Sequence, residues 1–189
     1  MQPEPSPTPP EPAQPAPRDA SAFGLFWPGK AAALAQAAAP ARSRLQPRGP
    51  TTSAVHSLIA GDNLEALRLL QPQFAGAVRL VYIDPPYNAG ADYLYADTFH
   101  TAKGCGRKHT RWLDLMLPRL VLTRELLRHD GVLFVSIGDH ELAHLRLLCD
   151  EVFGEHNFVG CVPRIAKRTS NRGTHFAPSK DYLLAYARD

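Results

Sequence analysis

The most chemically suggestive segment of the chain places an acid, two prolines, an aromatic ring and an amide in consecutive positions. It consists of Asp84, Pro85, Pro86, Tyr87 and Asn88. Neither proline has an N–H group, so the Asp84 carboxylate and the Pro85 carbonyl are adjacent acceptors with no donor between them. Two acceptors suit an exocyclic NH2 group, and stacking on Tyr87 would contribute about 1–3 kcal/mol per base. The segment predicts an amine-binding site, although the residue types leave open a plain turn that only ends a strand.

The element that must position this segment is the apolar run from Val78 to Ile83. A short run rich in β-branched residues is typical of a strand buried in a parallel sheet, and open α/β sheets place their chemistry at the carboxyl ends of such strands. We therefore expect Asp84 at the rim of a sheet. Pro85 and Pro86 restrict the backbone, so the turn should be ordered before any ligand binds.

Several segments together resemble one known family. They are Phe23 to Lys30, Gly61 to Leu67, Asp84 to Tyr87, Trp112 to Leu120, Asp130 to Ile137 and Asp181 to Ala187. Jointly they are similar to the S-adenosylmethionine-dependent DNA amino-methyltransferases, and most of all to the modification subunits of type III restriction-modification systems, which are beta-class adenine methyltransferases. The resemblance covers nearly everything from residue 23 to residue 189.

The resemblance implies an enzyme that transfers a methyl group from S-adenosylmethionine to the N6 amine of adenine. The adenine must leave the stack of double-stranded DNA to be reached. The implied catalytic residues are Asp84, Pro85, Pro86 and Tyr87, with Asn88 beside the substrate. The family also implies that Asp62 holds the adenosine end of the cofactor, although the same carboxylate is suited to capping the next helix. This chemistry consists of positioning and electrostatics, and we expect no metal.

Basic residues gather in two predicted loops, although the net charge of +3 does not by itself indicate DNA binding. The first group is Lys103, Arg107, Lys108, His109 and Arg111, and the second is Arg164, Lys167, Arg168 and Arg172. Such clusters can neutralise phosphates. We assign substrate binding to Arg107, Lys108, His109 and Arg168, with two solvated basic loops as the alternative.

One expected feature is missing, because no Phe-x-Gly-x-Gly cofactor loop occurs. The nearest cluster, Gly104-Cys105-Gly106, does not follow a strand or open a helix with a third glycine. We therefore expect an amino-terminal fragment that holds the catalytic half of a Rossmann-like methyltransferase fold. A catalytically incomplete nucleic-acid-binding or assembly piece is the alternative function. Cytosine-N4 transfer is a narrower rival, because cytosine enzymes more often carry serine where Asp84 stands.

A second motif points to a different class of enzyme. His140, Glu141 and His144 have the HExxH spacing of zinc peptidases. The extended pattern would need glycine and histidine where Leu147 and Asp150 stand, so the peptidase is a minor alternative. In the family resemblance this segment follows the Phe134-containing strand, and Gly138 and His140 depart from the usual Asp and Asn there.

Composition and periodicity divide the chain at about residue 50. Residues 1–50 form a Pro/Ala-rich leader that we expect to be largely disordered, with a marginal helix over 31–39, and residues 51–189 form the methyltransferase part. We expect α/β structure there: strands over 55–60, 78–83, 132–137, 158–163 and 182–187, a loop over 89–110, and helices over 63–70, 111–127 and 141–153. Pro118 predicts a kink or break in the second of these helices.

The remaining expectations concern surroundings and partners. Cys105, Cys149 and Cys161 lack the spacing of a disulfide framework or a zinc ribbon. No signal peptide or membrane-length apolar run is present, which indicates a cytoplasmic protein with no membrane partner. Besides DNA, the family suggests a second copy of the chain and a restriction (helicase-nuclease) subunit as partners.

Overall fold

The computed structural model describes residues 24–48, 56–89, 105–165 and 180–189. The strands of this part form one sheet in the order β1-β2-β4-β3. β1 (Val78–Ile83) is parallel to β2 (Leu127–Gly138), whereas β4 (Lys180–Ala187) is antiparallel both to β2 and to β3 (Phe158–Ile165). The sheet is therefore mixed, with a parallel pair at the end that carries Asp84.

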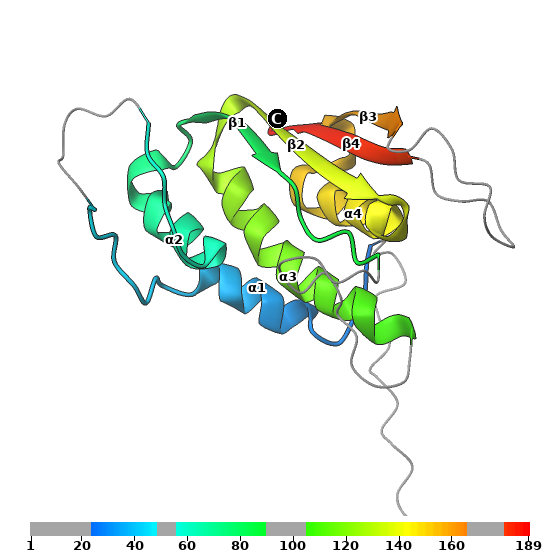
Figure 1. Ribbon diagram of the computed structural model, residues 1–189, viewed down its shortest axis with the longest axis horizontal. Coiled ribbons are helices and arrows are strands. Elements are labelled where there is room, and N and C mark those ends of the chain that lie inside the picture. The colour runs from blue at the N-terminus through cyan, green and yellow to red at the C-terminus, as the bar shows by residue number, and fades with distance from the viewer. Residues whose placement is uncertain (1–23, 49–55, 90–104, 166–179) are drawn as a thin grey trace, which may run out of the picture.

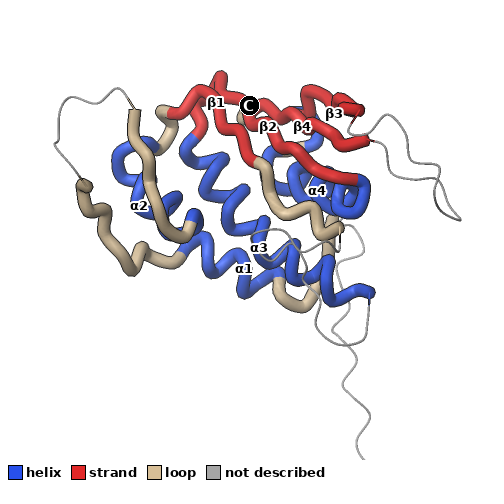
Figure 2. The backbone as a smooth tube through the Cα atoms, in the orientation of Figure 1, coloured by secondary structure: helices blue, strands red, loops and turns tan. Residues whose placement is uncertain are grey.

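The helices gather on one side of this sheet, as Figure 1 and the tube in Figure 2 show. They are α1 (Lys30–Ala38), α2 (Asn63–Phe74), α3 (Cys105–Leu126) and α4 (Asp139–Phe153), followed by a 3-10 turn over Glu155–Asn157. The core lies between α3, α4 and the sheet. Its fully buried side chains include Trp112, Leu120, Leu133, Ile137, Leu148 and Tyr186.

Much of the predicted α/β pattern is confirmed. The strand that precedes Asp84 has the predicted bounds, but it is not buried as predicted, because Leu80 and Tyr82 are each 57% exposed. β3 and β4, near the predicted positions of the last two strands, pair antiparallel. Asp62 caps α2, because its Oδ1 accepts hydrogen bonds from the Leu64 and Glu65 amides at 3.0 and 3.1 Å. Gly154 follows α4 with a φ of 94°, which favours glycine.

Three local predictions are wrong. Residues 56–60 form no strand, and Leu58 is 96% exposed, because no described strand lies beyond β1 to pair with them. The predicted loop over 89–110 ends too late, since α3 already begins at Cys105. Pro118 does not break α3, because burial of Leu117 and Leu120 against the core outweighs the backbone hydrogen bond that proline removes.

The segment before α1 is bonded to the core. The Trp27 indole donates to Asp114 Oδ1 at 2.7 Å, and Glu151 accepts from the Leu25 amide at 2.5 Å and from Lys30 Nζ at 2.6 Å. The short helix that the sequence predicts is therefore stabilised by packing on α3. The expected disorder of the first residues lies outside the described part, and the domain division at residue 50 stays a prediction.

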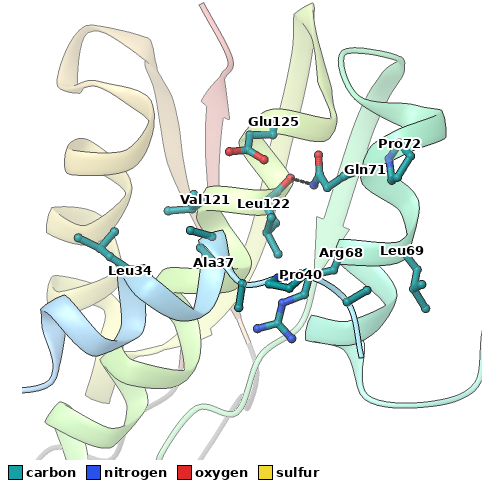
Figure 3. A pocket seen from close by; sticks show the side chains of 13 residues that line it. Leu34, Ala37, Pro40, Arg68, Leu69, Gln71, Pro72, Val121, Leu122 and Glu125 are labelled. Carbon is teal, nitrogen blue, oxygen red and sulfur yellow. Dashed lines mark hydrogen bonds between the residues drawn. The ribbon is translucent and has the colours of Figure 1, made fainter. Parts of the chain in front are cut away.

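Two cavities lie away from the Asp84 turn. One of about 510 Å³ opens between α1, α2 and α3, where Gln71 Nε2 donates to the Leu122 carbonyl at 2.9 Å (Figure 3). The other, of about 880 Å³, lies beside the amino end of β1 and is lined by Leu58, Phe74 and Val78 among others. Neither lining includes a predicted catalytic residue.

In the described part of the chain, every helix is too short or too polar to cross a membrane.

Candidate active site

Asp84 directly follows β1 and is exposed at the rim of the sheet. β1 and β2 are parallel, so the end of β2 at Gly138 reaches the same edge. Within the described part of the chain, Asp84 forms no ion pair. The carboxylate is thus exposed at the rim and not in the core, as its sequence position predicts.

Tyr87 lies against this carboxylate. Burial first, and then the hydrogen bond from its hydroxyl to Asp84, raise the pKa of Tyr87 far above its usual value. The ring also rests on Gly138, where an added Cβ would lie 3.1 Å from Tyr87 Cδ2. The absence of a side chain at Gly138 therefore gives the tyrosine ring room at the end of β2.

Buried groups hold the turn from two helices. The Trp112 indole of α3 donates to the Pro86 carbonyl at 2.7 Å, and Trp112 is completely buried. Asn88 has a φ of 55° and is 1% exposed, and its side-chain amide donates to Glu141 Oε1 of α4. The left-handed conformation of Asn88 is thereby stabilised by its own side chain. This geometry favours a positioning role for Asn88 over direct contact with a substrate.

Trp112 and Glu141 are site residues that sequence reasoning missed. Each bonds a turn residue far away in the chain, since Trp112 lies 26 positions from Pro86 and Glu141 lies 53 positions from Asn88. The sequence shows Trp112 only as part of a segment that resembles the methyltransferase family, and Glu141 only as the acid of the HExxH spacing. Neither observation predicts which residue of the turn the side chain would contact.

The predicted phosphate-binding residues of the first basic group do not all face outward. Lys108 is half-buried and Arg111 is exposed near the start of α3. His109 instead faces inward, with Nδ1 at 2.7 Å from Glu141 Oε1. Arg107 lies in α3 with its side chain outside the described part. Also outside it are Lys103, Lys167, Arg168 and Arg172.

Arg164, the described member of the second basic group, pairs across strands with Asp181. Its Nη2 lies 2.7 Å from Asp181 Oδ2, and the side chain is 71% exposed. This hydrogen bond, followed by the charge of Asp181, raises the pKa of Arg164. Arg164 therefore reaches the rim already paired with an acid.

Asp62, the predicted cofactor-binding residue, caps helix α2 and is also exposed to solvent. One oxygen caps α2, the other lies 3.6 Å from Arg119 Nη2, and the side chain is 60% exposed. Arg119 also donates through Nε to Asn63 Oδ1 at 2.7 Å. Burial lowers the pKa of Arg119, and the nearby Asp62 carboxylate opposes that shift. The capping alternative is thus confirmed, and it leaves the second oxygen accessible.

The class of protein to which this chain belongs is that of the DNA methylases. Residues 78–189 match the family model described as DNA methylase, and the chain belongs to this N6/N4 family. A structure of a Thermus thermophilus protein described as a DNA modification methylase, complexed with S-adenosyl-L-methionine, has a similar fold. Its TM-score is 0.51 at 19% identity, over 71% of this chain and 54% of that one.

The relatives include modification (Mod) subunits of type III enzymes and a type II methyltransferase, M.KpnI of Klebsiella pneumoniae, which is 34% identical over 74% of this chain. The chain is 35% identical to the EcoPI Mod subunit of Escherichia phage P1 and 33% identical to the EcoP15I Mod subunit of Escherichia coli. Each alignment covers 88% of this chain and 30% of the relative. The chain thus spans about a third of the length of these relatives.

Proposed function

We propose that this chain carries the catalytic turn of a methyltransferase that modifies the N6 amine of adenine in double-stranded DNA. The observation that carries the proposal is the exposed Asp84 carboxylate at the end of β1, beside Tyr87. Two further contacts support it, because Trp112 and Glu141 hold the turn in place before a substrate arrives.

The acceptors left at the turn match an amino group. Trp112 already occupies the Pro86 carbonyl, which leaves the Asp84 carboxylate and the Pro85 carbonyl for the two N–H bonds of adenine. A carboxylate has about four lone-pair sites, so Asp84 can keep its Tyr87 bond while accepting another. These bonds would draw the nitrogen lone pair out of ring conjugation, and Tyr87 would stack on the extruded base.

S-adenosylmethionine would supply an electrophilic methyl group carried on a sulfonium cation. The described residues fit part of this group, because the exposed Asp62 carboxylate can accept hydrogen bonds from the hydroxyl groups of its adenosine end. Asp62 would hold the adenosine end. The Asp84 carboxylate and the Pro85 carbonyl at the rim would orient the adenine amine by accepting hydrogen bonds from it.

The test is methyl transfer from labelled S-adenosylmethionine to duplex DNA, with the protein as its gene encodes it. We expect Asp84→Ala to reduce the rate at least about 100-fold while cofactor binding is unchanged, because only the amine loses its acceptor. Asp130→Ala is the matched control, since Asp130 is an exposed acid paired with Arg128. Undiminished transfer by Asp84→Ala would refute the proposal.

Analysis of the methylated base separates the adenine proposal from its cytosine rival. We expect N6-methyladenine in the digested DNA, whereas N4-methylcytosine would move the assignment to the other amine of the same family. Calorimetric titration of the 189-residue chain with S-adenosylmethionine tests the incomplete-piece alternative. Weak or absent binding is expected, because the chain has no Phe-x-Gly-x-Gly segment.

DNA is the partner that this proposal requires. Lys108 and Arg111 are the described residues we assign to phosphate contact, with Arg107 and Arg168 kept as predictions from the sequence. The names of the relatives include restriction-modification Mod subunits, which supports the proposal of a restriction subunit as partner. A homodimer and a cytoplasmic location also stay predictions.

A further inference from the structure

Two imidazoles and a carboxylate converge behind the catalytic turn. Glu141 is fully buried, and its two oxygens lie 2.7 Å from His109 Nδ1 and 2.8 Å from His144 Nδ1. The two histidine rings are 4.5 Å apart, and one ligating atom from each of the three residues lies within 4.8 Å of the others. The cluster joins α3 to α4.

One contact in the cluster is close without being a hydrogen bond. Glu141 Oε2 and His144 Nδ1 are both buried, and neither has a hydrogen-bond partner within the described residues, although they are 2.8 Å apart. Buried polar atoms are almost always satisfied, and a buried carboxylate needs a compensating charge. A cation that both atoms bind would meet both requirements.

We propose that His109, Glu141 and His144 bind one divalent transition-metal ion, with zinc as the ion that best suits the donors. Imidazole nitrogen and carboxylate oxygen bind zinc at about 2.0–2.2 Å, which places tetrahedral ligand atoms about 3.3 Å apart. The three ligand atoms, one from each residue, lie within 4.8 Å of one another, so on binding they would draw together by up to about 1.5 Å. Magnesium and calcium prefer all-oxygen sites. Both histidine side chains are partly exposed, at 26% and 33%, so an ion and a water ligand can enter.

This arrangement is different from the zinc-peptidase site suggested by the HExxH spacing. There His140 and His144 would bind the metal and Glu141 would act as a base. His140 is exposed and lies outside the cluster, whereas His109, 32 positions before Glu141, lies within it. With Glu141 as a ligand, the ion would be structural. It would fix α3 to α4 and, through the Glu141–Asn88 bond, steady the turn.

The experiment is titration of the purified 189-residue chain with Zn²⁺ and with Co²⁺, followed by calorimetry and by the visible spectrum of bound cobalt. We expect one ion per chain and no competition from Mg²⁺. His144→Ala should weaken binding about tenfold or more. His140→Ala should bind like the wild type, because it removes the other histidine of the motif. His109→Gln provides a second ligand variant, and circular dichroism checks that each variant is folded.

Several results would overturn the proposal. The first is the absence of stoichiometric Zn²⁺ or Co²⁺ binding. The second is wild-type metal affinity in the folded variants His144→Ala and His109→Gln. The third is loss of metal binding in His140→Ala while His109→Gln still binds the metal. A cobalt spectrum with thiolate charge-transfer bands would also overturn it, because the ligands would then be cysteines. The readout is metal binding alone, so failure of the proposed methyl transfer would leave this test unaffected.

Discussion

At the scale of single residues, the site depends on groups that never reach the rim. Asp84 and Tyr87 face each other there, but their position is set by bonds to Pro86 and Asn88 from buried side chains. A carbonyl that loses such a partner inside the protein would be left unsatisfied, at a cost of about 1–3 kcal/mol. Residues of this kind should affect catalysis without touching the substrate.

Trp112→Phe tests this view, because it keeps most of the buried ring and removes only the indole N–H. We expect the rate of methylation to fall about tenfold and the free energy of unfolding to fall by about 1–3 kcal/mol, since the Pro86 carbonyl loses its partner. Steady-state kinetics and urea unfolding measure the two effects. The cofactor affinity should not change.

The chain offers a matched control in its other tryptophan. Trp27 also donates its indole N–H at 2.7 Å, but to Asp114, away from the turn. Trp27→Phe should reduce stability by a similar order and leave the rate per folded molecule unchanged. Equal kinetic effects of the two substitutions would show that the Pro86 contact has no special role.

At the scale of elements, the amino-terminal segment is attached to α3 and α4 by a few polar contacts. Glu151 of α4 accepts hydrogen bonds from the Leu25 amide and from Lys30 Nζ. Gly29 leaves room for the Asp114 side chain, because a Cβ added at Gly29 would lie only 2.1 Å from Asp114 Oδ1. α1 then buries Ala33 in the core. The nine-residue helix thus depends on tertiary contacts for its stability.

Glu151→Ala should loosen this attachment. Because the Glu151–Lys30 pair is partly exposed, we expect a loss of only about 1 kcal/mol in the free energy of unfolding. Limited proteolysis should cut within residues 24–38 faster than in the wild type. Glu155→Ala, an exposed acid just beyond α4, is the control, and equal proteolysis of the two variants would contradict the role of Glu151.

Some elements could be predicted from the sequence and others could not. Val78 to Ile83 and the helix before Gly154 carry their signals locally, as apolar runs with clear ends. The start of α3 at Cys105 lies in a polar stretch with no such signal. Leu58 and Ile59 predict a strand because apolar residues of these types are common in strands. A strand also needs a neighbouring strand to pair with, and the local sequence does not show whether one is present.

The candidate site divides in the same way. Asp84 and Tyr87 could be found because they are consecutive with the strand that presents them. Glu141 could not, because its role depends on packing that brings His109 and Asn88 to it. In the sequence Glu141 stands out only as part of the HExxH spacing, a minor alternative, whereas the fold brings it to His109, which lies outside that spacing.

At the scale of the whole molecule, the sheet is covered unevenly. The helices lie on one side, and Leu80, Tyr82 and Val162 are each more than half exposed on the strands. Stability must therefore come mainly from the larger of the two described cores, which lies around α3 and α4. Two ionisable groups, Cys149 and Tyr186, lie in that core.

The burial of these groups predicts how stability changes with pH. Burial is the main cause that raises the pKa of Cys149 and that of Tyr186, which also donates to Asp150 Oδ1 at 2.6 Å. Both are protonated when folded, whereas in the unfolded chain they ionise near pH 8.5 and about 10. The stabilisation is complete below those values and is lost as the pH rises toward the folded pKa. Above about pH 9 the free energy of unfolding should fall by about 1.4 kcal/mol per pH unit for each ionised group.

Urea midpoints at pH 7, 9 and 10.5 measure this loss, and two cysteine variants assign it. Cys149→Ala should flatten the decline between about pH 8.5 and 10, because the thiol that ionises only in the unfolded chain is then gone. Cys161→Ala should keep most of the slope, since that thiol is exposed and its pKa is raised less by burial. A midpoint that stays constant up to pH 10.5, or an identical slope in both variants, would mean that the thiol at the centre of the core ionises as freely as in the unfolded chain. The complete burial of Cys149 makes that outcome incompatible with the core described above.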